Sequence, residues 1–366
     1  MTGIPAGAAR AAIVCLLALA AAPGLAGAGQ ATPVAEPPVP AWTQLGADGL
    51  VARTLAAGPC PEIVIDGAAA PMRQRAEPDA AFPMGVCEAA VPAGAASAEI
   101  GGQALRLLPA TVARIAVVGD TGCRIWQDRI QACNDPAAWP LAEISRQIAA
   151  WQPDVILHVG DYVYRESACP EGDARCAGSP YGDTGATWMA DFFGPMGSSL
   201  GAAPWIFLRG NHENCDREGM GWFRHLDTGP MPESCQPFTE PYRLPLAGAD
   251  VVVMDTAMVG DTQTTPELDA EYARQLGVVG ELSGPGTWLL THKPIAGGIL
   301  RLDGGERYVS YATMREATGN TLPAGVEVVV SGHIHLAQAL LFDADAGRPA
   351  PPPRTPPSGR PRPVPP

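Results

Sequence analysis

The chain has 366 residues, 46% of them hydrophobic, and a formal net charge of −14. This length and apolar content exclude a disordered polymer and allow one large domain together with a smaller one. The negative charge argues against a broad nucleic-acid-binding surface. An anionic substrate would therefore need a strongly positive group inside its site, and a metal ion would supply one.

The first 28 residues have the pattern of an export signal. Arg10 precedes an apolar run over residues 11–22, and small residues at 26–28 offer a cleavage site. We expect residues 1–28 to be removed, which leaves no stable membrane anchor and places the mature protein in the periplasm or outside the cell. An uncleaved anchor is the alternative.

Eight cysteines follow this segment, an even number in a chain expected to reach an oxidising compartment. This pattern predicts disulfides rather than a zinc ribbon, because no Cys-x-x-Cys pair occurs. Eight cysteines allow about a hundred pairings, and the sequence does not choose among them. Pairing of neighbours along the chain suggests Cys60 with Cys87, Cys123 with Cys133, Cys169 with Cys176 and Cys215 with Cys235.

The composition divides the rest of the chain into three parts. Residues 29–110 begin with a Pro-rich lead-in and continue as short apolar runs broken by Gly and Pro, which predicts a small β-rich module. Residues 111–346 contain apolar runs without alternation, which predict strands covered on both faces in a layered α/β domain. Residues 347–366 are so rich in proline that we expect an extended, solvated tail.

Six runs in the central part are predicted strands: "ARIAVVGD", "DVILHVGD", "PWIFLRGN", "VVVMDT", "TWLLTH" and "VEVVVSGH". The segment "PLAEISRQIAAWQPD" predicts a helix that Pro140 can start, because Leu141, Ile144, Ile148 and Trp151 recur at helical spacing.

Polar side chains follow most of these strands directly. They are Asp120, Asp161, Asn211 with His212, His292, and His333 with His335. In layered α/β sheets the loops at the strand ends present functional side chains from a rigid base. Carboxylate, amide and imidazole donors suit iron, zinc and manganese, and their number suits two ions with a bridging carboxylate. The short turn at Ser331–Gly332 would let the last two histidines reach two neighbouring ions.

Five ordered motifs resemble those of the calcineurin-like metallophosphoesterases, and specifically their purple acid phosphatase branch. The motifs are "GDTG" (119–122), "GDYVY" (160–164), "GNHE" (210–213), "THKP" (291–294) and "GHIH" (332–335). The resemblance implies an αββα sandwich. The branch rests on two details: Thr121 and Gly122 follow Asp120 where most of the superfamily has Asp-x-His, and Tyr164 stands where this branch supplies a phenolate.

The resemblance also implies roles for these residues. Asp120, Tyr164 and His335 would bind the first metal, Asn211, His292 and His333 the second, and Asp161 both. A phenol titrates near pH ~10, so a bound phenolate at Tyr164 favours ferric iron there, with iron, zinc or manganese as the second ion. His212 would protonate the leaving group or hold the phosphate.

We therefore expect a dinuclear hydrolase that acts on a small phosphorylated substrate, in which metal-bound hydroxide attacks phosphorus in line. Phosphate monoesters are the preferred substrate class, and phosphodiester or nucleotide hydrolysis is the nearest alternative. A third possibility is a non-catalytic product truncated at its C-terminus, because the family continues beyond "GHxH" with further strands, whereas here the Pro-rich tail follows almost at once.

Three further polar residues have less certain roles. His158 lies within a predicted strand and is expected to be a hydrogen-bonded core histidine. His225 could reach substrate. Asp255 is either a hydrogen-bond acceptor for a ligand histidine or a cap at the end of its strand.

Overall fold

The computed structural model describes residues 39–246, 249–295, 297–300, 306–309, 311–319 and 321–337. The expected export signal (1–28) and the expected Pro-rich tail (347–366) lie outside the described residues. Among the described helices, none combines the length and the apolar character needed to cross a membrane.

The first sheet has seven strands in the order β5-β6-β2-β1-β13-β12-β9. The neighbouring strands β1, β13, β12 and β9 are parallel, and those on the other side of β1 are antiparallel. The bounds of the seven are β1 (Ala41–Gly46), β2 (Gly49–Ala56), β5 (Arg73–Ala76), β6 (Gly85–Val91), β9 (Ile115–Val118), β12 (Val155–His158) and β13 (Trp205–Phe207).

The second sheet has four strands in the order β14-β15-β16-β19. Its last three strands are parallel, and β14 is antiparallel to β15. The strands are β14 (Tyr242–Leu246), β15 (Ala249–Val253), β16 (Thr287–Leu290) and β19 (Val326–Val330).

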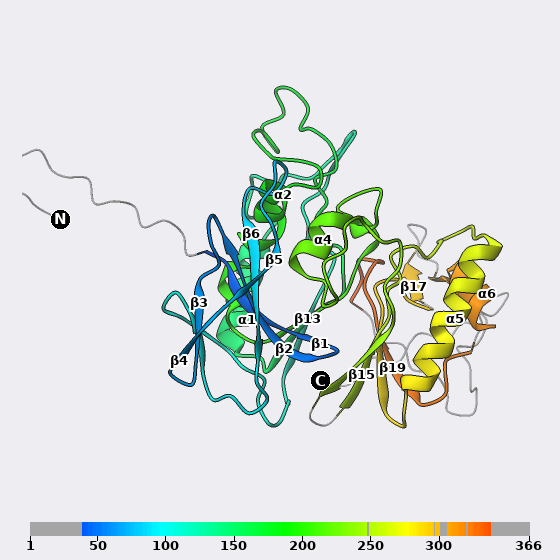
Figure 1. The fold of residues 1–366 in the computed structure, drawn as a ribbon. Coiled ribbons are helices and arrows are strands. Elements are labelled where there is room, and N and C mark those ends of the chain that lie inside the picture. Colours follow the sequence, from blue (N-terminus) through cyan, green and yellow to red (C-terminus); the bar gives the residue numbers. More distant parts are fainter. Residues whose placement is uncertain are drawn as a thin grey trace, which may run out of the picture. The chain divides into compact units, whose positions relative to one another are not determined.

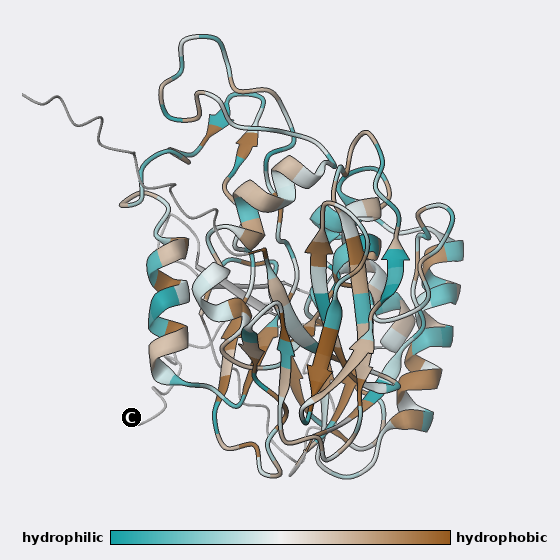
Figure 2. Cartoon of the chain, turned by 60° about the vertical axis from the view of Figure 1, so that its left-hand side comes forward, coloured by the Kyte–Doolittle hydropathy of each residue, from teal (hydrophilic) through white to brown (hydrophobic). Residues whose placement is uncertain are grey.

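Helices cover the outer faces of the two sheets (Figure 1). On the first sheet lie α1 (Leu141–Trp151), α2 (Gly185–Trp188), the π-helix η1 (Met189–Phe193), α3 (Gly197–Leu200) and α4 (Gly219–His225), and on the second lie α5 (Pro266–Leu282) and α6 (Ala312–Thr318). A short 3₁₀-helix, η2 (Asn211–Glu213), follows β13. In Figure 2 several central strands are coloured as apolar, and the helices that flank them carry both polar and apolar turns.

The packing of β12 explains the layers. Val155 and Leu157 point into the space between the two sheets, where they meet Leu244 and Val251 of the second sheet. Ile156 points the other way, into the cluster that holds the helices of the first sheet. All four residues of β12 are buried, because a strand between two apolar layers needs apolar side chains on both faces. The predicted αββα sandwich is thus the observed fold.

The segment before residue 110 is rich in β-structure, as predicted. Its strands β3 (Glu62–Ile65), β4 (Ala68–Pro71), β7 (Ala98–Ile100) and β8 (Gln103–Leu105) form a separate four-stranded sheet. The other four strands of this segment extend the first sheet of the sandwich by pairing β1 with β13. The domain boundary expected near residue 110 stays a prediction.

Two further hairpins complete the described structure, β10 (Ile125–Trp126) with β11 (Arg129–Ile130) and β17 (Gly297–Leu300) with β18 (Glu306–Val309). The four cysteine pairs suggested by neighbour pairing are confirmed: Cys60–Cys87, Cys123–Cys133, Cys169–Cys176 and Cys215–Cys235.

Two expectations were wrong in detail. Within the described residues β9 and β19 each pair with one strand only, and Val117 and Val328 are 51% and 37% exposed. The exposure of these two valines shows that β9 and β19, which lie at sheet edges, are not covered on both faces as predicted. The predicted helix α1 is present, but Ile144 and Trp151 on its predicted apolar face are exposed.

Candidate metal centre

The polar residues that follow the parallel strands lie together at one edge of the sandwich. Two groups of donor atoms share the carboxylate of Asp161. One group adds His292 and His333, and the other adds Asp120 and His335; within each group the donor atoms lie within 4.8 Å of one another. Parallel strands end at the same edge of a sheet, and this is what gathers residues separated by up to 215 positions in the chain.

The backbone at these strand ends is left-handed. Asp120, Asp161, His333 and His335 have φ angles of 55°, 62°, 72° and 51°. Such angles are uncommon for residues with a Cβ, and they persist where surrounding contacts hold them. One such contact joins two of these residues: the backbone N–H of His333 donates to both carboxylate oxygens of Asp120 at 3.0 Å. The left-handed turns direct the side chains away from the strands and into the centre.

Two glycines allow the loops to approach closely. Gly160 has a φ of +99°, and a Cβ on it would lie 2.6 Å from Nδ1 of His292 and 2.8 Å from Cα of Gly210. A Cβ on Gly210 would lie 2.1 Å from Oδ1 of Asp161. The glycines of the "GD" and "GN" motifs are thus required by the contact between the two loops.

Asp161 faces the two donor groups with different oxygens. Its Oδ1 lies 3.2 Å from Nε2 of His292, and its Oδ2 accepts a hydrogen bond from the Tyr164 hydroxyl at 2.8 Å. The residue is 1% exposed. Burial opposes ionisation of this carboxyl, but the charge and hydrogen bond of His292 outweigh burial and hold the pKa of Asp161 well below its usual value. A charged carboxylate with one oxygen toward each group has the geometry of a bridge.

Tyr164 connects the first donor group. Its hydroxyl lies 3.0 Å from Nε2 of His335 and 3.4 Å from Oδ1 of Asp120, which itself lies 3.3 Å from Nε2 of His335. Burial and the charges of Asp161 and Asp120 raise the pKa of the Tyr164 phenol far above its ordinary value. The phenol therefore needs a strong positive charge beside it to ionise.

His292 and Asn211 connect the second group. Nδ1 of His292 lies 2.7 Å from the carbonyl oxygen of Val159, so this nitrogen donates and Nε2 faces the centre, 3.1 Å from Oδ1 of Asn211. The backbone N–H of His292 donates to Thr256 at 3.0 Å. Burial lowers the pKa of His292, but the charge of Asp161 and their hydrogen bond outweigh it and raise this pKa to about 9.

His333 is held from outside the centre by Asp261. Nε2 of His333 lies 3.4 Å from one carboxylate oxygen of Asp261, and Lys293 donates to the other at 2.7 Å. The ring also packs at 5.3 Å against Tyr311. Burial lowers the pKa of His333 and favours the neutral imidazole, which is the form that binds metals. Asp261 and Lys293 were not singled out from the sequence.

His212 lies beside the centre. The backbone N–H of His212 donates to Oδ1 of Asp161 at 3.0 Å. The centre of its ring lies 3.9 Å from the centre of the Tyr164 ring, and the two rings are tilted by 35°. Nδ1 contacts the carboxylate of Glu166, and Nε2 lies 3.9 Å from Oδ2 of Asp161. Burial raises the pKa of Glu166, but His212 and Arg217 outweigh it and hold this pKa below its usual value.

Glu213 is a buried carboxylate that holds the Asp161 loop. One oxygen accepts the N–H groups of Tyr162 and Val163 at 2.8 and 3.3 Å, and the other accepts those of Asp161 and Gly210 at 3.0 Å each. Burial and the charge of Asp161 raise its pKa to about 8, against the opposing effect of these donors. The "GNHE" motif contained this residue, but sequence reasoning gave it no role.

Asp191 holds the Tyr164 loop in the same way. It belongs to the π-helix η1, is fully buried, accepts the N–H of Tyr164 at 2.9 Å and pairs with Arg165. No motif surrounds Asp191 in the sequence. Its only signal is an acidic residue within the apolar run "WMADFF", since a buried carboxylate needs donors around it.

The three residues with uncertain roles lie outside the centre. His158 is buried, hydrogen-bonded to Thr121 at 2.9 Å and stacked on Tyr162, so the core interpretation is confirmed. His225 is 2% exposed, and its burial excludes contact with substrate. Asp255 accepts from Arg209 and from the N–H of Ala257 rather than from a histidine, so it caps its strand.

These side chains suit a pair of metal ions. Oxygen and imidazole donors are the ligands that iron, zinc and manganese accept. Within the described residues the donor atoms face one another across two groups with a shared carboxylate, and Nε2 of His292 is left facing this space by the bond at Nδ1. That His292, Asn211 and the other predicted ligands bind ions stays a prediction.

Comparison with known proteins identifies the family. A family model for the calcineurin-like phosphoesterases matches residues 113–337, which is more than half of the chain. The chain therefore belongs to the calcineurin-like phosphoesterase family. A search of curated protein sequences found no significant match.

Two solved structures are among those that match the chain. One is the purple acid phosphatase PPD1 isolated from yellow lupin (Lupinus luteus) seeds, with a TM-score of 0.47 and 12% identity over 81% of this chain and 58% of that chain. The other is PhoD, with a TM-score of 0.44 and 14% identity over 76% of this chain and 66% of that chain. The chain thus spans less than two thirds of the length of either protein.

Proposed function

We propose that the protein hydrolyses phosphate monoesters at a dinuclear metal centre built around Asp161. The proposal rests on the contacts of the two Asp161 carboxylate oxygens: Oδ1 faces His292, and Oδ2 faces Tyr164. A carboxylate whose two oxygens face separate sets of donors can serve two ions, and this arrangement supports the proposal.

The other predicted ligands form two sets, one beside each carboxylate oxygen of Asp161. Asp120, Tyr164 and His335 would hold one ion on the Oδ2 side, and Asn211, His292 and His333 would hold the other on the Oδ1 side. The phenol favours ferric iron on its side and leaves iron, zinc or manganese for the other. When bound, such a pair polarises a phosphoryl oxygen and makes water a nucleophile near neutral pH.

His212 would transfer the proton. The contact of Nδ1 with Glu166 orients the ring, while Nε2 faces the centre. In the hydrolysis, the oxygen of water joins phosphorus and the bond from phosphorus to the alcohol oxygen breaks. Nε2 of His212 gives its proton to that oxygen, and the proton released by water restores the ring.

The metal and proton-transfer roles can be separated by two variants. Asp161→Asn should lose bound metal, whereas His212→Ala should keep metal and lose about 10²-fold or more in kcat. Asp227→Asn is the control, because Asp227 is also buried but pairs with Arg75. Metal content per folded molecule and phosphate release from a monoester and a diester would be measured. Equal metal loss in the Asp161 and His212 variants would refute the assigned roles.

We also propose that the protein works in the periplasm or outside the cell. The four disulfides support an oxidising compartment. Mass spectrometry of the protein recovered from its native host would test this, since cleavage near residue 28 is expected.

A further inference from the structure

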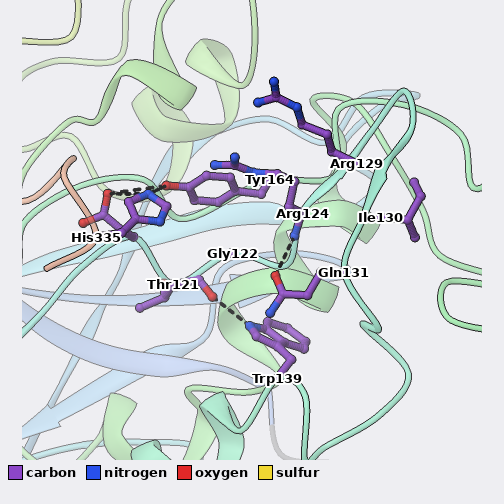
Figure 3. A pocket seen from close by; sticks show the side chains of 10 residues that line it. Thr121, Gly122, Arg124, Arg129, Ile130, Gln131, Trp139, Tyr164 and His335 are labelled. Carbon is purple, nitrogen blue, oxygen red and sulfur yellow. Dashed lines mark hydrogen bonds and ion pairs between the residues drawn. The ribbon is translucent and has the colours of Figure 1, made fainter. Parts of the chain in front are cut away.

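A pocket of 540 Å³ adjoins the Tyr164 side of the metal centre (Figure 3). Asp120, Tyr164 and His335 form its inner end, and Arg124 and Arg129 line it farther out. In Figure 3 the guanidinium group of Arg124 lies over the ring of Tyr164, and Arg129 lies farther from His335. A molecule bound at the centre can therefore extend into a space that carries two positive charges.

A braced hairpin presents these arginines. Arg124 directly precedes β10, Arg129 is the first residue of β11, and the Cys123–Cys133 disulfide closes the hairpin at its base. The hairpin is also tied to the Tyr164 loop, because the N–H of Ile125 donates to the carbonyl oxygen of Tyr164 at 2.9 Å. The two guanidinium groups thus extend from a constrained frame, which lowers the entropy lost when they bind a ligand.

Neither guanidinium forms an ion pair with a carboxylate among the described residues, although the charge of Arg124 reaches Glu166 and helps to lower the pKa of that carboxyl. That of Arg124 lies 5.0 Å from the ring centre of Tyr164, and that of Arg129 lies 5.3 Å from the ring centre of Trp126. By contrast, the nearby Arg165 pairs with a carboxylate. In a chain with a net charge of −14, two unpaired cations in one pocket are available for an anion from outside.

We propose that this pocket binds a second anionic group carried by the leaving alcohol of the substrate. The inference rests on the proposed phosphomonoesterase function and names its substrate class: phosphate esters whose alcohol bears another phosphate or a carboxylate. Arg124 and Arg129 bind that second anion, and Ile130 and Trp139, which also line the pocket, contact the carbon chain between the two groups.

Three substrates of equal chain length test the proposal. Propyl phosphate has a neutral leaving group, 3-phosphooxypropanoate carries a carboxylate, and propane-1,3-diyl bisphosphate carries a second phosphate. The metal-loaded wild-type protein should show a kcat/KM for one or both anionic substrates at least about tenfold above that for propyl phosphate. The two anionic substrates distinguish a carboxylate from a phosphate as the preferred group.

The ratio of kcat/KM between an anionic substrate and propyl phosphate cancels any general loss of activity. This ratio should fall about tenfold or more in Arg124→Ala and in Arg129→Ala. Arg146→Ala is the control, because Arg146 is an exposed arginine on α1 that pairs with Glu143, and its ratio should equal that of the wild type. A wild-type ratio near one, or an unchanged ratio in both pocket variants, would overturn the proposal.

Binding separates failure of this inference from failure of the proposed function. The non-hydrolysable propane-1,3-bisphosphonate should bind the metal-loaded wild type, and Kd should rise about tenfold or more in Arg124→Ala. Such a rise without hydrolysis of any substrate would support the pocket and refute the activity. Hydrolysis of propyl phosphate with an unchanged Kd would support the activity and refute the pocket.

Discussion

Replacing Glu213 by Gln should destabilise the Asp161 loop, because an amide NH₂ group would replace an oxygen that accepts backbone N–H groups. Both oxygens of Glu213 accept from backbone N–H groups only, two on each oxygen. In Glu213→Gln two buried N–H groups lose their acceptor, at a cost of about 1–3 kcal/mol each. Gln also removes the buried charge whose cost raises the pKa of Glu213 to about 8, and this offsets part of the loss. The free energy of unfolding should therefore fall by less than the ~2–6 kcal/mol lost with the acceptors.

Glu218 is a matched control five residues along the chain. It is also a buried glutamate, but burial and then the charges of Glu213 and Glu166 raise its pKa to about 10. One of its oxygens has no hydrogen-bond partner among the described residues. The side chain is therefore a neutral acid over most of the pH range, and Gln is close to it in shape and charge. At about pH 9 the wild-type Glu218 must take up a proton on folding, because its carboxyl is neutral in the folded chain and ionised in the unfolded one. Glu218→Gln removes this cost and should therefore raise the unfolding free energy.

Denaturant unfolding of the metal-free proteins at about pH 9 measures the unfolding free energy of both variants and of the wild type. At this pH Glu213 of the folded wild type is ionised and Glu218 is neutral. Calorimetric titration with metal then tests the link to the centre, since a displaced Asp161 should weaken binding in Glu213→Gln. Equal stability of the two variants, or a larger loss in Glu218→Gln, would refute the role of Glu213 as the anchor of this loop.

Two further predictions concern His225 and Tyr164. Burial lowers the pKa of His225 to about 3, below its unfolded value near ~6.5. Between these two pH values the unfolded chain therefore binds one more proton than the folded chain. Stability is lost as the pH falls through this range. His225→Phe should reduce the dependence of unfolding free energy on pH in this range by up to about 1.4 kcal/mol per pH unit; an unchanged slope in denaturant titrations would contradict this. Iron-loaded wild type should be coloured by phenolate bound to ferric iron, and Tyr164→Phe should lose the visible absorption while Tyr311→Phe keeps it. Retention of the band in Tyr164→Phe would place the chromophore elsewhere.

The sequence pointed to residues that the structure brings together, because most of them follow an apolar strand within a few positions, and that they bind metal ions stays a prediction. Asp120, Asp161, His292 and His333 are fixed in place by the ends of β9, β12, β16 and β19, so recognising the strands also located the side chains. Neighbour pairing of the cysteines succeeded for a similar reason, since each bridge closes a segment of 7–27 residues.

The supporting residues could not be predicted in this way. Asp191 reaches the Tyr164 loop from a π-helix 27 residues away, and Asp261 reaches His333 across 72 residues. Such contacts depend on how elements pack rather than on local pattern. The continuation of the first sheet into the N-terminal strands has the same origin, because the pairing of β1 with β13 joins residues about 160 positions apart. The exposure of Ile144 and Trp151 on α1 likewise depends on which elements the helix packs against.

A crystal structure of the metal-loaded protein, with anomalous diffraction recorded at the absorption edges of iron, zinc and manganese, tests the bridging role of Asp161 most directly. We expect two peaks about 3.5–4 Å apart, one beside Oδ1 with His292 and one beside Oδ2 with Tyr164. A single peak, or two peaks that do not share the Asp161 carboxylate, would contradict the dinuclear centre.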